Sequence, residues 1–176
     1  MGDRRAETEA GDHGLAFGRL VEPQLDRVYR LATVILGDRA EAEDAVHDAA
    51  LRAWRHFGDL RDPGRFDAWF TRIVVNACRD RIGARRVRAL TVSDPDAGCA
   101  PDHVEALVRH DTLERAIRSL SPEHRVVVAL RYVGDYSIEE IGVRTGERTG
   151  TVKSRLHYAL RAMRAAIEAE AREVIR

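Results

Sequence analysis

Residues 136–164 read YSIEEIGVRTGERTGTVKSRLHYALRAMR and predict a helix, a tight turn and a second helix. Ser137 is followed three residues later by Glu140, the spacing of a capping box, in which two side chains satisfy free backbone N–H groups at a helix start. Gly146 ends this helix, because helices commonly stop at a residue in the left-handed conformation that glycine adopts easily. The second helix is predicted to begin at Gly150.

The second helix is predicted to have one apolar side and one polar, basic side. Apolar residues recur every three or four positions, at Val152, Leu156, Leu160, Met163 and Ile167. The opposite face carries Thr151, Ser154, Tyr158 and Arg161. No acidic residue lies between Arg148 and Arg164. Such a pair of helices is typical of a helix-turn-helix that reads duplex DNA, and a plain helical hairpin with a solvated basic face is the alternative.

Length and composition favour helices. The chain has 176 residues, enough for one domain or two small ones. Charged residues make up 33% and aromatic residues only 6%, so the core consists mainly of Leu, Val, Ile and Ala, which suits helices better than sheets. Lys and Arg number 29, as do Asp and Glu, so the formal net charge is zero. Acidic and basic residues are nevertheless segregated along the chain, which indicates separate charged surfaces.

Cysteine usage and hydropathy predict where the protein resides. Cys78 and Cys99 lack the spacing of a zinc site and are too few for a disulfide framework, which favours a reduced cytoplasm. A regulatory disulfide between them is the less favoured alternative. No apolar run approaches the roughly 20 residues of a membrane span, and the N-terminus lacks the apolar segment of a signal peptide. We therefore expect a cytoplasmic protein without membrane insertion, metal or cofactor.

The first part of the chain is predicted to hold a polar tail and two helices. Residues 1–14 have nothing to bury and are predicted to be a disordered tail. A helical period then spans 17–37, and Pro23 marks either its start or a bend. The next helix spans about 40–57, with Asp38 as its cap. Its predicted buried side consists of Ala45, Val46, Ala49, Ala53 and Trp54.

An acidic cluster occupies the first turns of the helix over 40–57. Its members are Glu41, Glu43, Asp44 and Asp48. Negative charge near a helix N-terminus is favourable for the helix dipole, so a solvated helix start is one interpretation. A metal site is disfavoured, because no matching His or carboxylate cluster occurs elsewhere in the sequence.

A strongly amphipathic helix follows a loop over 58–64. Its apolar residues are Phe66, Trp69, Phe70, Ile73, Val74 and Ala77. Its other side carries Arg72, Asn76, Arg79 and Asp80 and continues into Arg81, Arg85, Arg86 and Arg88. Aromatic residues beside a basic strip are typical of single-strand binding, where stacking contributes roughly 1–3 kcal/mol per base and arginines follow the phosphates. Phe66 and Phe70 are assigned to the core, while Trp69 is compatible with either role.

A linker divides the chain into two domains. Between residues 89 and 102 the helical pattern stops and the Asp-, Pro- and Gly-rich composition predicts a flexible connection. The first helical domain is therefore 15–88 and the second 103–176. In the second domain Ser121 caps a helix that has Pro122 at its first position, and Gly134 ends that helix. No strand pattern persists, so we predict an all-α fold of two small helical domains.

Several motifs resemble one family. The octapeptide GTVKSRLH at 150–157 resembles the start of the recognition helix in region 4 of sigma-70 family factors. The segments LSPEHR at 120–125 and YSIEEI at 136–141 resemble the lead-in of that region. In the first domain, AEDAVHDAALRAW at 42–54 and FDAWFTRIVVNACRD at 66–80 resemble sigma region 2.

The resemblance covers residues 15–165 and lacks a region 3 domain, which is typical of the extracytoplasmic-function (ECF) group. It implies a transcription initiation factor that binds core RNA polymerase, at the β′ clamp coiled coil and the β flap, and directs it to promoter DNA. The implied polymerase contacts are Glu43, Asp44, Asp48 and Arg52. An anti-sigma factor is a further expected partner.

The resemblance also implies two sets of DNA contacts. The residues expected to bind and melt the −10 element, with Asn76 holding a flipped base, are Asp59, Arg61, Arg65, Trp69, Asn76, Arg79, Arg85 and Arg86. The residues expected to read the −35 element are Arg148, Thr151, Lys153, Ser154, Arg155, His157 and Arg161. Within the second set, Lys153, Ser154 and His157 are assigned to base edges, and Arg148 and Arg155 to the backbone.

The chain departs from the family pattern at four positions. His47 stands where Gln is usual, and Gly142 where Ala is usual. Thr145 and Glu147 occupy positions that are usually apolar, which predicts looser packing of the first helix of the helix-turn-helix.

Two other functions fit parts of the sequence. A one-component regulator would combine the helix-turn-helix with a helical ligand-sensing domain, but it needs no acidic helix followed by an aromatic and basic one. A helical enzyme using Glu43, Asp44 and Asp48 would need a second catalytic cluster, and the sequence shows none. The promoters read, the inducing signal and the anti-sigma partner are not specified by the sequence.

Overall fold

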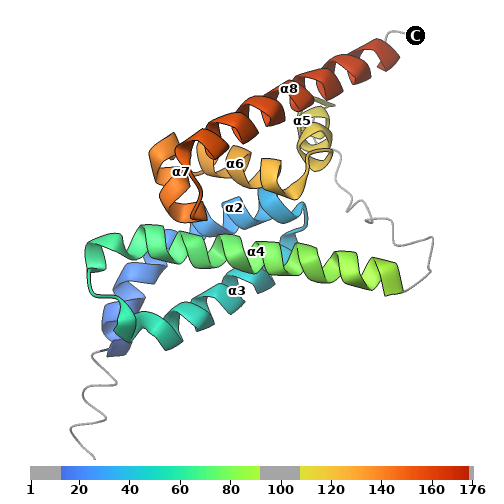
Figure 1. Cartoon of the computed structure of the whole chain (residues 1–176). Helices are drawn as coiled ribbons and strands as arrows, with labels where there is room; N and C mark the ends of the chain where they lie inside the picture. The colour runs from blue at the N-terminus through green and yellow to red at the C-terminus, as the bar shows by residue number, and fades with distance from the viewer. Residues whose placement is uncertain (1–12, 92–107, 175–176) are drawn as a thin grey trace, which may run out of the picture.

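The computed structural model describes residues 13–91 and 108–174, and within these ranges the regular structure is entirely helical. This confirms the predicted all-α fold (Figure 1). The first module, residues 13–91, contains α2 (Leu25–Leu36), α3 (Arg39–His56) and α4 (Phe66–Thr91). The second module, residues 108–174, contains α5 (Val108–Arg118), α6 (Pro122–Tyr132), α7 (Ile138–Thr145) and α8 (Thr149–Val174). Short 3-10 turns span Glu22–Gln24, Phe57–Asp59 and Pro63–Arg65.

Side-chain caps start the helices where the sequence predicts them. Asp38 accepts a hydrogen bond from the backbone N–H of Glu41 at 3.0 Å, which starts α3. At α7 the capping box is complete: the Ser137 hydroxyl accepts from the N–H of Glu140 at 3.2 Å, and the Glu140 carboxylate accepts from the N–H of Ser137 at 2.8 Å. The hydrogen bonds from Ser137 lower the pKa of Glu140, because they favour the charged carboxylate.

Helix ends agree with the prediction at α7 and differ slightly elsewhere. Gly146 ends α7 with φ of 74°, a left-handed conformation that a residue with a Cβ adopts only with strain. The next helix, α8, begins at Thr149, one residue before the predicted start. Helix α6 ends at Tyr132, ahead of Gly134.

The ends of the first module extend beyond the predicted boundaries. Residues 13–21 are helical and lead into the 3-10 turn that contains Pro23, so Pro23 marks a bend. His13 and Gly14, which were expected in the tail, belong to this helix. Helix α4 continues to Thr91, past the predicted linker start at 89. The rest of the tail, the rest of the linker and Cys99 lie outside the described residues.

The two modules share one apolar core. Helix α2 packs against α3 and α4 of its own module and against α6 of the other, while α4 also packs against α7. The resulting cluster includes Phe66 and Phe70 together with Val126, Ile141 and Val152. In Figure 1, α6 and α7 lie on one side of α4 and α3 lies on the other. The modules therefore meet through α2 and α4 of the first and α6 and α7 of the second.

Three positions expected on apolar faces are exposed. Trp54 is 40% exposed, although its ring contacts Phe17 edge-on with centroids 5.3 Å apart. On α8, Leu160 and Ile167 are also exposed. The stripe that packs inward runs through Val152, Leu156, Ala159 and Met163, since Ala159 was too small to stand out as an apolar position in the sequence.

Candidate nucleic-acid interface

The N-terminal half of α8 presents a continuous polar face to solvent. Val152 and Ala159 are fully buried beneath it and fix the rotation of the helix. The predicted −35 contacts that are exposed on or just before this helix are Arg148, Thr151, Lys153, Ser154, His157 and Arg161. Arg155 differs from them, because it is half-buried and its guanidinium donates to Glu123 on α6 of the same module. The helix-turn-helix therefore exposes most of its predicted reading face.

The turn between α7 and α8 explains two departures from the family pattern. A Cβ at Gly142 would lie 2.8 Å from the carbonyl oxygen of Glu147, so the turn backbone approaches α7 too closely for alanine at this position. Thr145 is buried, and its hydroxyl donates to the carbonyl oxygen of Ile141 at 2.8 Å. The expectation of loose packing is wrong at Thr145, because its polar group is satisfied.

Helix α4 carries three of the predicted −10 residues, with Arg72 between them, along one stripe. Trp69, Arg72, Asn76 and Arg79 follow one another at intervals of three or four positions, so they lie on one side of the helix. Asn76 is exposed, and Trp69 is half-buried with its ring 5.7 Å from that of Phe66. Trp69 thus combines a packed edge with a partly accessible one.

A loop precedes this stripe. Asp59, Arg61 and Arg65 are all exposed between α3 and α4. Asp59 lies 3.3 Å from His56, and Arg65 lies 3.5 Å from Asp62. These pairs are exposed and contribute little stability, so the three side chains are accessible to a ligand.

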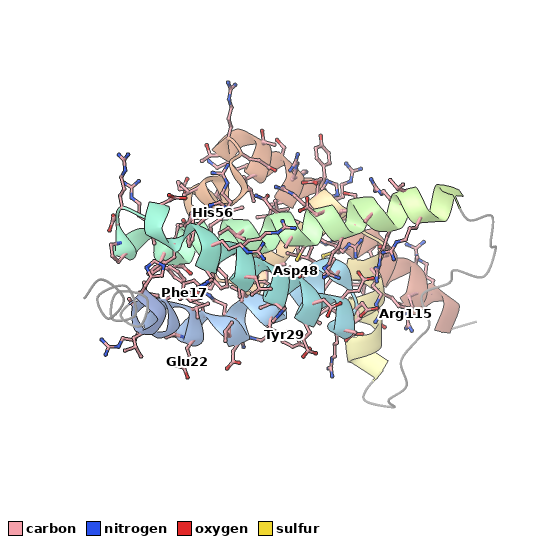
Figure 2. The ribbon with its side chains drawn as sticks, turned by 90° about the horizontal axis from the view of Figure 1, so that it is seen from below. Phe17, Glu22, Tyr29, Asp48, His56 and Arg115 are labelled. Atoms are coloured by element: carbon pink, nitrogen blue, oxygen red, sulfur yellow. The ribbon has the colours of Figure 1, made fainter. Side chains whose placement is uncertain are left out.

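The acidic cluster of α3 pairs with arginines of α4. Arg81 contacts Asp48 at 2.7 Å and Asp44 at 3.4 Å, and Figure 2 shows Asp48 on α3 beside α4. Burial alone would lower the pKa of Arg81, but the hydrogen bond that Arg81 donates to Asp48 and the charges of the nearby carboxylates raise it. Glu43 is exposed and forms no ion pair with any described residue.

Two further predicted site residues take part in contacts between α3 and α4. Arg85, expected to grip DNA, contacts Glu41 at 2.7 Å and Asp38 at 3.4 Å. Arg52 contacts Asp80 at 2.9 Å. Arg86, which follows Arg85 in α4, is exposed. The predicted contacts therefore include some groups that already have intramolecular partners.

An ion-pair network joins the two modules through pairings that the sequence did not indicate. It consists of Arg79, Glu123, Glu147 and Arg155. Nη2 of Arg79 lies 2.9 Å from Oε2 of Glu123 and 2.9 Å from Oε1 of Glu147. Nη1 of Arg155 lies 3.0 Å and 2.6 Å from the same two oxygens. The structure thus brings together one predicted −10 residue and one predicted −35 residue.

A second polar cluster lies at the start of α4. The carboxylate of Asp67 contacts Arg27 of α2 and Arg144 of α7, and it accepts a hydrogen bond from the Tyr136 hydroxyl at 3.2 Å. The guanidinium of Arg144 lies 3.7 Å from the centroid of the Tyr136 ring, a cation–π geometry. Periodicity could not have revealed this cluster, because its members are far apart in the sequence.

Within residues 13–91 and 108–174, no group of three or more His, Cys, Asp or Glu side chains could hold a metal ion. None of the described helices is both long and apolar enough to cross a bilayer.

Two protein-family models match the chain. "Sigma-70 region 2" matches residues 20–88, and "Sigma-70, region 4" matches residues 110–163. The ECF RNA polymerase sigma factor SigL of Mycobacterium tuberculosis is 36% identical over 148 residues, which cover 80% of this chain and 82% of SigL. The ECF RNA polymerase sigma factor SigW of Bacillus subtilis is 29% identical over 175 residues, which cover 92% of this chain and 93% of SigW.

Solved structures share the fold. The sigma factor RpoE from Bartonella quintana, in complex with the anti-sigma factor NepR, superposes with a TM-score of 0.70 at 21% identity, over 86% of this chain and 96% of that chain. CnrH, in complex with the cytosolic domain of CnrY, superposes with a TM-score of 0.61 at 26% identity, over 96% of this chain and 91% of that chain.

Proposed function

Because this chain belongs to the ECF group of the sigma-70 family of RNA polymerase sigma factors, we propose that it binds core RNA polymerase in the cytoplasm and directs it to specific promoters, with no catalytic activity of its own. The observation that carries this proposal is that matches to region 2 and region 4 occur in one chain. A conventional one-component regulator has no need of region 2, so that alternative is disfavoured.

The second module reads the −35 element as duplex DNA. The first turn of α8 has free N–H groups and the positive end of the helix dipole, where a phosphate binds favourably. Lys153, Ser154 and His157 are exposed beyond this turn and are assigned to base edges. Arg148 is assigned to the backbone, since it is exposed at the turn itself.

The first module opens the −10 element. Extruding a base costs roughly a few kcal/mol of stacking and pairing, which a pocket must recover. The amide of Asn76 can both donate hydrogen bonds to a base edge and accept them from it. Trp69 lies on the same side of α4, one turn before Arg72. Arg61, Arg65 and Arg86 are exposed and are assigned to the flanking phosphates.

The acidic face of α3 is assigned to the polymerase. Glu43, Asp44 and Asp48 would contact the β′ clamp coiled coil, and the second module would contact the β flap. Asp48 also pairs with Arg81, so it supports the packing of α3 on α4 as well. An anti-sigma factor is a further proposed partner. RpoE was solved in complex with the anti-sigma factor NepR, and CnrH in complex with the cytosolic domain of CnrY.

Run-off transcription tests this function. Core RNA polymerase from the source cell is incubated with fragments of that genome, with and without the purified chain. A sigma factor produces discrete transcripts that start at defined sites, and core alone does not. If the chain binds DNA in the absence of core but produces no discrete transcripts with it, the chain is a regulator and the proposal is wrong.

A further inference from the structure

A basic cavity lies where the end of α2 meets α4 and the start of α6. Its volume is about 520 Å³, which is within the range of small-molecule sites. The residues that line it come from α2, α4, α6 and the turn between α5 and α6. They include Arg85, Arg86 and Arg125, and none of the lining residues is acidic. The cavity therefore has the charge of a site for an anion.

The three arginines differ in how their charges are compensated. Arg85 pairs with Glu41 at 2.7 Å and with Asp38 at 3.4 Å. Neither Arg86 nor Arg125 forms an ion pair with any residue in 13–91 or 108–174. Nε of Arg125 is buried and has no hydrogen-bond partner among these residues either. Two guanidinium groups at the cavity, one from each module, are thus left for an external partner.

Arg125 holds its charge in surroundings that disfavour it. Burial lowers the pKa of Arg125, and the charges of Arg85 and Arg86 lower it further. Its Nη1 lies beside the end of α2, since a Cβ at Gly37 would be 3.7 Å away, and a helix C-terminus supplies only partial negative charge. Charges that are shielded from water are normally paired. An anion in the cavity would be the partner that Arg125 lacks within the described part of the chain.

The hydroxyl of Ser121 adds a hydrogen-bond donor to the cavity. As the cap of α6, Ser121 accepts a hydrogen bond from the N–H of His124 at 3.4 Å, which leaves its own proton to be donated. Ser119 also lines the cavity, but its hydroxyl donates to the carbonyl oxygen of Ala116 at 2.8 Å. Ser121 is therefore the hydroxyl that can bind an anion together with the arginines.

The charge and the apolar part of the lining together indicate the class of ligand. A phosphate monoester carries about 1.5 to 2 negative charges at neutral pH, which matches the two guanidinium groups without partners, and arginine binds phosphate through paired hydrogen bonds. The cavity is also lined by Leu36, Ile82 and Leu120. A bare phosphate ion would leave this apolar surface uncovered, whereas an organic group attached to the phosphate would cover it.

We propose that this cavity binds a small phosphate monoester with an apolar body. The phosphate lies between Arg86 and Arg125 and accepts a hydrogen bond from the Ser121 hydroxyl, and the body packs against the apolar lining. The site goes beyond the proposed function, in which Arg125 has no role. Arg86 is assigned there to a DNA phosphate, so the experiment must distinguish a free phosphate ester from the DNA backbone.

The test is calorimetric titration of the full chain with phenyl phosphate at constant ionic strength. Inorganic phosphate, which lacks the ring, and benzenesulfonate, which has the ring and a single charge, are the comparison ligands. Phenyl phosphate is expected to bind about tenfold more tightly than either, because only phenyl phosphate combines both features. Equal affinities for all three ligands would reveal only general attraction of anions and would overturn the proposal.

Two substitutions locate the binding. Arg125→Gln and Arg86→Gln should each weaken phenyl phosphate binding by about tenfold or more, since hydrogen bonds to charged groups typically contribute that much. Their controls are Arg164→Gln on α8 and Arg39→Gln on α3, which remove the same charge from exposed positions of the same modules. If either substitution weakens binding no more than its control does, the proposal is wrong.

Thermal unfolding shows that the Arg125→Gln chain is folded. Without ligand this chain should unfold at a temperature no lower than the unchanged chain, because the substitution relieves repulsion by Arg85 and Arg86. Should it fail to fold, Arg86→Gln alone decides the outcome, since Arg86 is exposed and its replacement leaves the packing intact.

A single-stranded oligonucleotide without terminal phosphates distinguishes the two sources of phosphate. Arg125→Gln should weaken oligonucleotide binding no more than Arg164→Gln does. A loss as large as the loss of phenyl phosphate binding would place the cavity on the DNA path and overturn the proposal. Run-off transcription keeps the proposed function separate: Arg125→Gln should produce the same transcripts as the unchanged chain, and absence of transcripts from the unchanged chain would contradict only the proposed function.

Discussion

Glu147 illustrates what a single residue contributes in this protein. In the sequence it appears as a charged residue at a usually apolar position and predicts poor packing. In the structure its carboxylate lies between Arg79 and Arg155, and its carbonyl oxygen lies so close to α7 that position 142 requires glycine. The departure at Glu147 therefore reflects a partner in the other module, and no local rule could have supplied that partner.

Lys153 and Arg155 are predicted to have different roles. Lys153→Ala should relax preference at one position of the −35 element at a cost of about 1–3 kcal/mol, because it removes a base contact. Arg155→Ala should weaken binding to all sequences, because it removes a phosphate contact. It should also lower the slope of log affinity against log salt concentration by about one. Holoenzyme binding to −35 variants over a salt series checks both roles. If Arg155→Ala changed the sequence preference and Lys153→Ala changed only the salt dependence, the two roles would be exchanged.

Asn76→Ala is expected to impair melting. The amide side chain is exposed on α4 and is assigned to a flipped base, whose extrusion costs roughly a few kcal/mol. Open-complex formation should therefore fall more on duplex promoters than on promoters pre-melted at the −10 element. Arg30→Ala, an exposed change on α2, serves as the control. An equal loss on both templates would count against a role in melting.

Cys78 is predicted to be inert in the folded chain. Burial raises the pKa of its thiol from 9.0 to about 12, although Arg81 acts in the opposite direction. The folded state thus keeps its proton while the unfolded state releases it, so stability falls as the pH rises from about 9 toward about 12. In a Cys99→Ser chain at pH 8, alkylation of Cys78 should be far slower than in urea. Equal rates would show that Cys78 is accessible.

At the scale of elements, α3 and α4 act as a pair. The sequence correctly predicts α3 as a helix capped by Asp38 and α4 as an amphipathic helix. It does not reveal that the acids of α3 pair with the arginines at positions 81 and 85 of α4, because both sets also read as solvated charge. Charge patterns identify surfaces, but the choice between an external and an internal partner depends on how the helices pack.

Glu43 offers the sharpest test of the acidic face. Reversal of Asp48 would also break its 2.7 Å contact with Arg81, whereas Glu43 is exposed and pairs with no described residue. Glu43→Lys should weaken core binding, because like charges across an interface cost on the order of several kcal/mol. Glu22→Lys, at an exposed position of the 3-10 turn before α2, should leave core affinity unchanged. If the two variants bind core equally well, Glu43 does not face the polymerase.

At the scale of the whole molecule, the helices were predictable and the arrangement of the modules was not. Apolar periodicity and caps identify each helix, since those signals are local. The packing of α4 against α7 and of α2 against α6 depends on residues far apart in the sequence, among them Asp67, Arg144 and Tyr136. A linker pattern indicates that two modules can separate, and it carries no information about how they pack when they are together.

The central claim is that one chain reads −35 duplex and opens the −10 element as part of the polymerase. Permanganate reactivity combined with footprinting on a single promoter measures this most directly. Core polymerase with this chain should protect the −35 element and, in the same complex, make thymines of the −10 element reactive. Neither core alone nor the chain alone should produce reactive thymines. Protection by the chain alone at a −35-like site, without reactive thymines when core is added, would contradict the account.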